Sequence, residues 1–135
     1  MNQLPETLAP TQLTITPEVI AAYAELTQDF NPIHLDAEFA AKTLMGGVIA
    51  HGTMSIGLIW QALENSIGAA AFADAHLHIR FVNPVRVGET LVAGGRLRAD
   101  APRSYEVWVR AGQHDGDRLI GSLSLAATQT TGETP

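Results

Sequence analysis

A long apolar segment, residues 52–67, constrains the fold of this chain more than any other feature. Its first turns carry apolar side chains all around the helix, and polar residues gather only toward its end. The apolar positions are Met54, Ile56, Leu58, Ile59, Trp60, Ala62 and Leu63. A helix that is apolar on every side is typical of a buried helix. We therefore expect the rest of the 135-residue chain to cover this helix, as one domain spanning residues 1–135.

The sequence period changes from helical to alternating at residue 75. From there, apolar and polar residues alternate in short runs separated by turns, which predicts antiparallel strands. The expected strands are 75–81, 91–97, 105–110 and 119–127, with turns at 88–89 and 113–117. Helices first and strands later favour an α+β fold, in which an antiparallel sheet covers the buried helix.

The N-terminal half supplies the other expected helices. A capping threonine followed by proline predicts a helix over residues 17–28. Asp36 is expected to cap a second, short helix over residues 37–42. Residues 12–15 are predicted as a short strand. Residues 1–10, which are polar and contain two prolines, are predicted as a loose arm.

Composition and charge exclude several classes of function. The chain has no cysteine, so neither a disulfide nor a thiolate zinc site can form. A net charge of −6 argues against nucleic acid as a partner. All seven arginines lie between Arg80 and Arg118, where they could form a local anion site or remain solvated strand charges. With no membrane-spanning run and no signal-peptide pattern, we expect a cytoplasmic protein without a membrane partner.

Two neighbouring motifs carry the chemistry of the chain. The first places Asp29 and His34 on either side of Asn31 and Pro32. Pro32 has a fixed φ and keeps the residue before it out of the helical region, so the turn can aim the carboxylate and the imidazole at one point. The second motif opens the apolar helix with Gly52, where unpaired N–H groups favour negative charge. An acid/base pair beside such a site is typical of proton transfer next to a carbonyl.

These motifs resemble those of the MaoC-like, (R)-specific enoyl-CoA hydratase family, which has a hot-dog fold. The matching residues are Asp29, Asn31, Pro32, His34, His51 and Gly52, and residues 81–89 are similar to a strand and turn of the family. The resemblance implies an enzyme that hydrates trans-2-enoyl thioesters of coenzyme A or acyl carrier protein, or dehydrates 3-hydroxyacyl thioesters. Asp29 and His34 would be the catalytic pair, and the Gly52 N–H the oxyanion contact. A homodimer is also implied, and the reaction needs neither a metal nor a resident cofactor.

Four further residues are expected near this site. Asn31 would shape the turn, and His51 would support the start of the helix beside the substrate. Ser55 could reach the substrate or bond back to its own helix. Trp60 stands where some hydratases have a small polar residue, which would shorten or bend the acyl tunnel. The simpler interpretation of Trp60 is a core side chain.

The remaining histidines offer a weaker indication of a metal site. His76 and His78 share one face of a predicted strand, and together with His114 they could bind a metal. Alternating spacing alone is a weak signal, so exposed strand residues or a dimer contact are the favoured interpretation. We therefore expect no metal.

Two alternative functions remain open on the sequence. A hot-dog thioesterase also uses a carboxylate to activate water, but that class usually lacks the spacing of Asp29 and His34. A non-catalytic subunit that binds acyl thioesters would be the partner of an active homologue. The intact Asp29–His34 pair argues against that second alternative.

Overall fold

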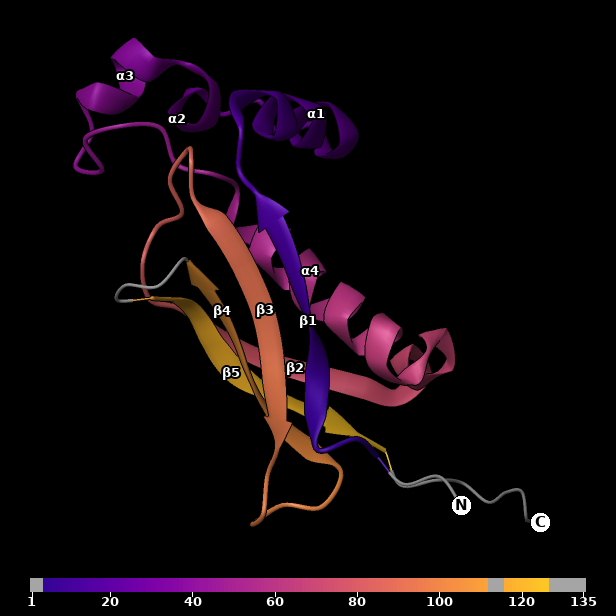
Figure 1. Cartoon of the computed structure of the whole chain (residues 1–135). Coiled ribbons are helices and arrows are strands. Elements are labelled where there is room, and N and C mark those ends of the chain that lie inside the picture. Colours follow the sequence, from indigo (N-terminus) through magenta and orange to yellow (C-terminus); the bar gives the residue numbers. More distant parts are fainter. Residues whose placement is uncertain (1–3, 112–115, 127–135) are drawn as a thin grey trace.

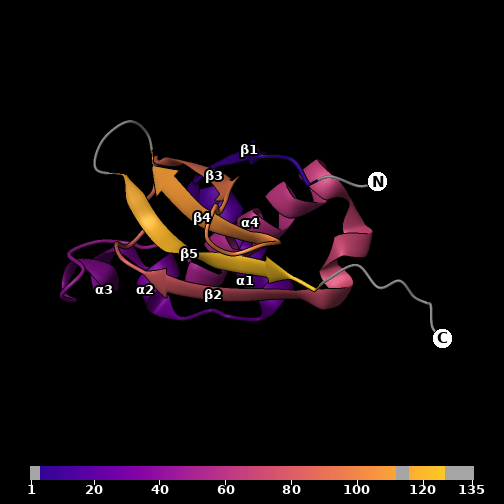
Figure 2. The same ribbon diagram turned by 90° about the horizontal axis from the view of Figure 1, so that it is seen from below.

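The computed structural model describes residues 4–111 and 116–126. A sheet of five antiparallel strands covers the long helix α4, and helices α1 to α3 lie together at one end (Figure 1). The helices are α1 (Pro17–Thr27), α2 (Pro32–Leu35), α3 (Ala37–Ala41) and α4 (Gly52–Ile67), followed by the 3-10 helix η1 (Ala69–Asp74). The strands are β1 (Thr7–Thr14), β2 (Ala75–Phe81), β3 (Thr90–Leu97), β4 (Ser104–Ala111) and β5 (Asp117–Leu125). From below, the strands curve around α4 (Figure 2).

The sheet has the strand order β1-β3-β4-β5-β2, and every neighbouring pair is antiparallel. Alternation determines which side chains face α4. In β4, Tyr105, Val107 and Val109 are buried, whereas Glu106 and Arg110 are exposed. α4 packs against β1, β3 and β4. The predicted α+β, hot-dog arrangement is thereby confirmed.

Helix α4 spans the predicted residues, but it is not buried on every side. Its buried side chains are Met54, Ser55, Leu58, Ile59, Ala62 and Leu63. An exposed stripe runs through Thr53, Gly57, Gln61 and Glu64. The expectation of burial all round was wrong because these small or polar residues recur every three or four positions, which places them on one face of the helix.

The N-terminal strand is longer than predicted. β1 begins at Thr7, so the loose arm expected over residues 1–10 is wrong for its last part, and Leu8 joins the buried core. Pro10 is tolerated because β1 is an edge strand with an irregular register between Leu8 and Thr11. Pro10 has no N–H to donate, but at such a position the pairing of the strands does not need one.

The other predicted boundaries agree with the structure to within a few residues. Thr16 caps α1 and Asp36 caps α3, in both cases through a side-chain oxygen that accepts backbone N–H groups. The single-turn helix α2 was not predicted. β5 begins at Asp117, whereas His114, Ala127 and most of the turn before β5 lie outside the described residues. No helix in the described part of the chain is long and apolar enough to cross a membrane.

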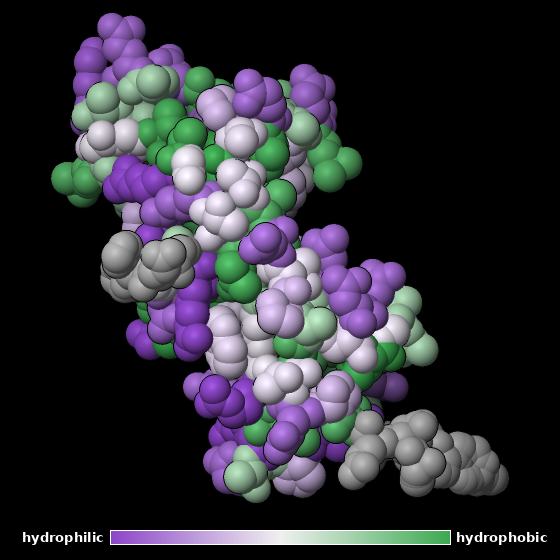
Figure 3. Space-filling model, viewed as in Figure 1, coloured by the Kyte–Doolittle hydropathy of each residue, from purple (hydrophilic) through white to green (hydrophobic). Residues whose placement is uncertain are grey.

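The end of the molecule formed by α1 to α3 exposes large apolar side chains. These are Leu26, Phe30, Leu35, Phe39, Leu44 and Met45. Figure 3 shows apolar patches over this end, interspersed with polar side chains. Exposed apolar surface of this kind is typical of an interaction surface.

Candidate active site

The turn between α1 and α2 places Asp29 in the site. Gln28 ends α1 in the left-handed conformation, with φ at 59°. Oδ1 of Asp29 accepts the Asn31 N–H at 3.3 Å, and Oδ1 of Asn31 accepts the Ile33 N–H at 3.1 Å. Asn31 thereby caps α2, which begins at Pro32. The side chains at positions 29 and 31 build the turn in which they lie, so Asn31 has a structural role here.

His34, in α2, is oriented by the main chain. Its Nδ1 lies 2.8 Å from the carbonyl oxygen of Ile49. Because a carbonyl oxygen only accepts, Nδ1 carries the hydrogen and donates it. The Nε2 atom of the neutral ring therefore keeps its lone pair and is able to accept a proton.

His51 immediately precedes α4 and is 2% exposed. Its Nε2–H donates to the backbone carbonyl oxygen of Asp29 at 3.0 Å. Its ring stacks on that of His34, with centroids 3.8 Å apart and planes inclined by 27°. Tyr23 of α1 packs edge-on against the same ring at a centroid distance of 5.0 Å. Nδ1 of His51 is buried, and it has no hydrogen-bond partner in the part of the chain that the structure describes.

The side chains of Asp29, His34 and His51 converge. One carboxylate oxygen and one ring nitrogen of each histidine all lie within 4.8 Å of one another. Two polar groups up to about 5 Å apart can share one water that bonds to each at about 2.8 Å, and Asp29 and His34 lie within this limit. A metal ion bound by both His34 and His51 would have to lie in the plane of each imidazole. The two rings are stacked, and their planes do not meet within coordination distance, so this pair of rings fits a shared metal poorly. The arrangement suits proton transfer.

A cavity of about 310 Å³ lies beside His34 and the start of α4. It is lined by His34, Met45, Ile49, Ala50, Gly52, Ser55, Phe81, Val82, Asn83, Pro84, Val85 and Arg118. Gly52 is the first residue of α4, and a Cβ there would lie 3.1 Å from Cζ of Phe81. The first N–H groups of a helix have no intrahelical acceptor. The backbone at Gly52 can therefore offer an N–H to a ligand in the cavity.

The remaining predicted site residues differ in how they relate to this cavity. Ser55 lines it and is 2% exposed. Trp60 is not among the residues that line it and packs edge-on against Phe72, with ring centroids 5.6 Å apart. Asp29 is exposed and does not line the cavity either, although its carboxylate approaches the His34 ring.

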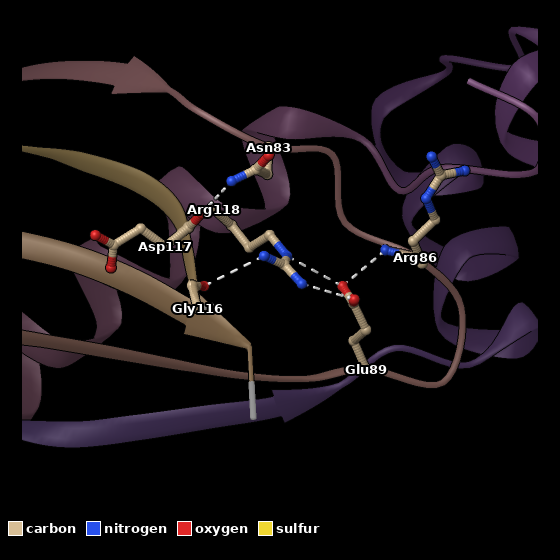
Figure 4. Close-up of polar contacts among 6 residues, drawn as sticks. All are labelled: Asn83, Arg86, Glu89, Gly116, Asp117 and Arg118. Atoms are coloured by element: carbon tan, nitrogen blue, oxygen red, sulfur yellow. Dashed lines mark hydrogen bonds and ion pairs between the residues drawn. The ribbon is translucent and has the colours of Figure 1, made fainter. Parts of the chain in front are cut away.

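An ion pair at the cavity was not predicted from the sequence. Arg118, a lining residue, donates to Glu89 through Nη2 at 2.8 Å and through Nε at 3.3 Å (Figure 4). The Arg86 N–H donates to the same carboxylate at 2.9 Å. Partial burial alone would raise the pKa of Glu89, but these hydrogen bonds and the charges of both arginines outweigh it and lower the pKa below its usual value. Only the general cluster of arginines hinted at this pair, because the partners are 29 residues apart.

Several curated relatives of the chain are named as hydratases or dehydratases. The chain is 39% identical over 70 residues to a 3-hydroxybutyryl-CoA dehydratase of Methylorubrum extorquens, and the match covers 52% of this chain and 45% of the relative. It is 35% identical over 86 residues to an (R)-specific enoyl-CoA hydratase of Aeromonas caviae, covering 62% of this chain and 64% of the relative. The chain thus spans between 45% and 64% of the length of these curated relatives.

Solved structures show the same likeness over nearly the whole chain. The (R)-hydratase from A. caviae superposes with a TM-score of 0.73 at 26% identity, covering 93% of this chain and 98% of that one. An R-hydratase from Pseudomonas aeruginosa superposes with a TM-score of 0.75 at 24% identity, covering 95% and 83%, and supports the fold alone. The family described as MaoC like domain matches residues 3–107. The chain therefore belongs to the MaoC-like domain family.

Proposed function

We propose that this chain catalyses the (R)-specific addition of water to trans-2-enoyl thioesters, and the reverse dehydration of (R)-3-hydroxyacyl thioesters. The observation that carries the proposal is the approach of the Asp29 carboxylate and the His34 imidazole to within 4.8 Å. His34 borders a largely apolar cavity that Gly52, the first residue of α4, also borders. The names of the relatives support the same reaction class.

In the hydration direction, one water held by the two side chains supplies both parts of the addition. The water gives a proton to one of the two groups, and its oxygen forms the bond to C3. The electrons of the C2=C3 bond move toward the thioester carbonyl, and the other group then delivers a proton to C2. The proton taken from the water passes to that second group and restores the pair, so the net addition is one water. Nε2 of His34 has the lone pair for the first step and a protonated Asp29 would serve the second, although reversed roles give the same product. General acid–base catalysis of this kind is worth ~10²–10⁴-fold.

Negative charge that develops on the thioester oxygen during this reaction needs a donor. We assign this role to the Gly52 N–H, because it lies at the start of α4, where the helix dipole favours an anion. The Phe81 ring lies against Gly52 and lines the same cavity, so a larger residue at position 52 would push against that ring.

The thioester carrier in this proposal is coenzyme A or acyl carrier protein, and the setting is the cytoplasm. The chemistry needs neither a metal nor a resident cofactor, because the thioester itself takes up the electron pair. Arg118 borders the cavity, but Glu89 neutralises it at 2.8 Å. A phosphate or acidic group of the carrier that contacted Arg118 would therefore compete with Glu89 for its charge.

We also propose that the chain works as a homodimer. The α1–α3 end exposes large apolar side chains, and Phe81 is 52% exposed although it lines the cavity. A second copy that covers Phe81 would close the cavity to bulk water. Light scattering of the purified chain tests this proposal, and a monomer at working concentration would contradict it.

The enzymatic proposal is tested with crotonyl-CoA and longer 2-enoyl-CoA thioesters. We expect loss of absorbance from the conjugated double bond, and a product that an (R)-specific, but not an (S)-specific, 3-hydroxyacyl-CoA dehydrogenase oxidises. Free thiol is measured in the same reactions. Thiol release without hydration would support the thioesterase alternative, and binding without turnover across the panel would support the non-catalytic one.

A further inference from the structure

His51 contacts both members of the Asp29–His34 pair. Its Nε2–H donates to the Asp29 carbonyl at 3.0 Å, and its ring stacks on the His34 ring at 3.8 Å between centroids. Asp29 follows α1, whereas His34 belongs to α2, so the two groups come from different elements. The residue after His51 is Gly52, whose N–H is the proposed oxyanion donor. One side chain thus connects three parts of the site.

We propose that His51 is a positioning residue that holds Asp29 and His34 at their working distance and aligns both with the Gly52 N–H. This inference rests on the proposed hydratase function. In this scheme His51 transfers no proton itself, because its Nε2–H is bonded to a backbone carbonyl and its Nδ1 is buried.

The unpaired nitrogen of His51 indicates that the residue does more than fill space. The Asp29 carbonyl can only accept, so Nε2 carries the hydrogen and Nδ1 of the neutral ring carries a lone pair. That lone pair is buried, and it has no partner among the described residues. A buried polar atom without a partner costs free energy, which a phenylalanine or leucine of similar size would avoid. What offsets the cost here is the Nε2 hydrogen bond and the stacking, and both of these go to the acid/base pair.

Tyr23 restrains the His51 ring from a separate helix. Its ring packs edge-on at a centroid distance of 5.0 Å, and its hydroxyl lies 2.6 Å from Oγ1 of Thr53. Thr53 is in the first turn of α4, so Tyr23 joins α1 to the segment that also carries His51 and Gly52. The His51 ring is therefore restrained by contacts from α1 and α2, and Tyr23 is itself bonded to the first turn of α4.

Two substitutions separate the contacts that His51 makes. His51→Phe keeps an aromatic ring against His34 but removes the donor to Asp29. His51→Gln keeps a side-chain N–H of similar reach but removes the ring. Val107→Ala serves as a control, because Val107 is 1% exposed in the core and outside the cavity, so it lowers the melting temperature without touching the site.

Steady-state kinetics on crotonyl-CoA then test the inference. We expect His51→Phe to lower kcat by about tenfold to a hundredfold, because small displacements of reacting groups are costly, while KM changes less than about twofold. His51→Gln should recover part of the kcat lost by His51→Phe. Val107→Ala should keep the wild-type kcat despite its lower melting temperature. A His51→Phe enzyme with kcat within about twofold of wild type, or with a loss that Val107→Ala matches, would overturn the inference.

Nitrogen NMR of the histidine rings distinguishes a failed inference from a failed function. If the wild-type chain hydrates no 2-enoyl thioester, the proposed function fails and the spectra alone decide about His51. The bond to Ile49 requires the Nδ1–H form of His34. Loss of this single form in His51→Phe would support positioning, whereas an unchanged His34 spectrum would overturn it.

Discussion

The sheet and the α1–α3 end of the molecule are held together in different ways. In the sheet, backbone ladders join the strands, and side chains such as Val107 and Leu119 are buried by alternation along their strands. At the α1–α3 end the helices are short, and the decisive bonds join side chains to the main chain, as from His34 to Ile49 and from His51 to Asp29. The comparison indicates that the stability of the sheet depends little on individual polar atoms. At the α1–α3 end, by contrast, single polar atoms determine the geometry of the candidate site.

The largest effect should come from removing the acid/base pair. We expect Asp29→Asn or His34→Ala to lower kcat/KM at least about a hundredfold, because each removes one of two groups needed for proton transfer. The melting temperature should change little, since Asp29 is exposed and His34 is only half-buried. Full activity in both variants would contradict the assignment of the chemistry to the α1–α3 end and of the stability to the sheet.

A substitution in the core under the sheet should lower stability and leave kcat unchanged. Leu63 of α4 is fully buried at 0% exposure, so Leu63→Ala should reduce the free energy of unfolding by about 2–5 kcal/mol through lost burial and a residual cavity. Urea denaturation measures this loss. The kcat of the protein that remains folded should match wild type, and a kcat that falls in proportion to stability would show that the two regions are not independent.

A smaller effect is expected at the start of α4. Gly52→Ala places a methyl group about 3.1 Å from the Phe81 ring, which is half-exposed in the single chain, so the chain should still fold. We expect kcat to fall about tenfold, because the methyl group pushes against the Phe81 ring that lines the cavity beside the proposed oxyanion donor.

Gly57→Ala is the matched control for Gly52→Ala. It lies in the same helix and its added Cβ meets nothing within 4 Å. Helix propensity should make this variant more stable by about 0.5–1 kcal/mol, with unchanged kcat. Equal kinetic losses in the two variants would contradict the assignment of Gly52.

Another small effect concerns the ion pair between Glu89 and Arg118. Because the folded-state pKa of Glu89 is lowered, its carboxylate stabilises the fold above the usual glutamate pKa, and this stabilisation is lost as pH falls through the folded-state pKa. Glu89→Gln should therefore be less stable than wild type by about 1 kcal/mol at neutral pH, with the difference vanishing in acid. Thermal unfolding as a function of pH measures the difference, and a constant gap down to the lowest pH would contradict the ionised pair.

Local patterns predicted the sheet better than the site. Alternation located β2 to β4, and a capping threonine and aspartate located the starts of α1 and α3, because these signals lie within a few residues. The length of β1 was missed because Pro10 is compatible with a strand only at an edge, and edge position depends on the whole sheet.

The residues of the candidate site were predicted mainly by resemblance. The turn from Asp29 to His34 has a local mechanism, but its approach to His51 depends on how α1, α2 and α4 pack together. The stacking of the two histidines and the pairing of Arg118 with Glu89 join residues that are far apart in the chain, so no short pattern could reveal them.

The bond from His34 to the Ile49 carbonyl has a consequence for how such a protein can diversify. When a carboxylate side chain orients a catalytic histidine, the tautomer of the imidazole depends on that side chain. A substitution of the carboxylate residue then alters the reactivity of the histidine. Here the partner of His34 is the backbone carbonyl of residue 49, and this carbonyl is present whichever side chain stands at that position. Ile49 is among the residues that line the cavity, so a mutation at this position can change the cavity while the imidazole keeps its tautomer.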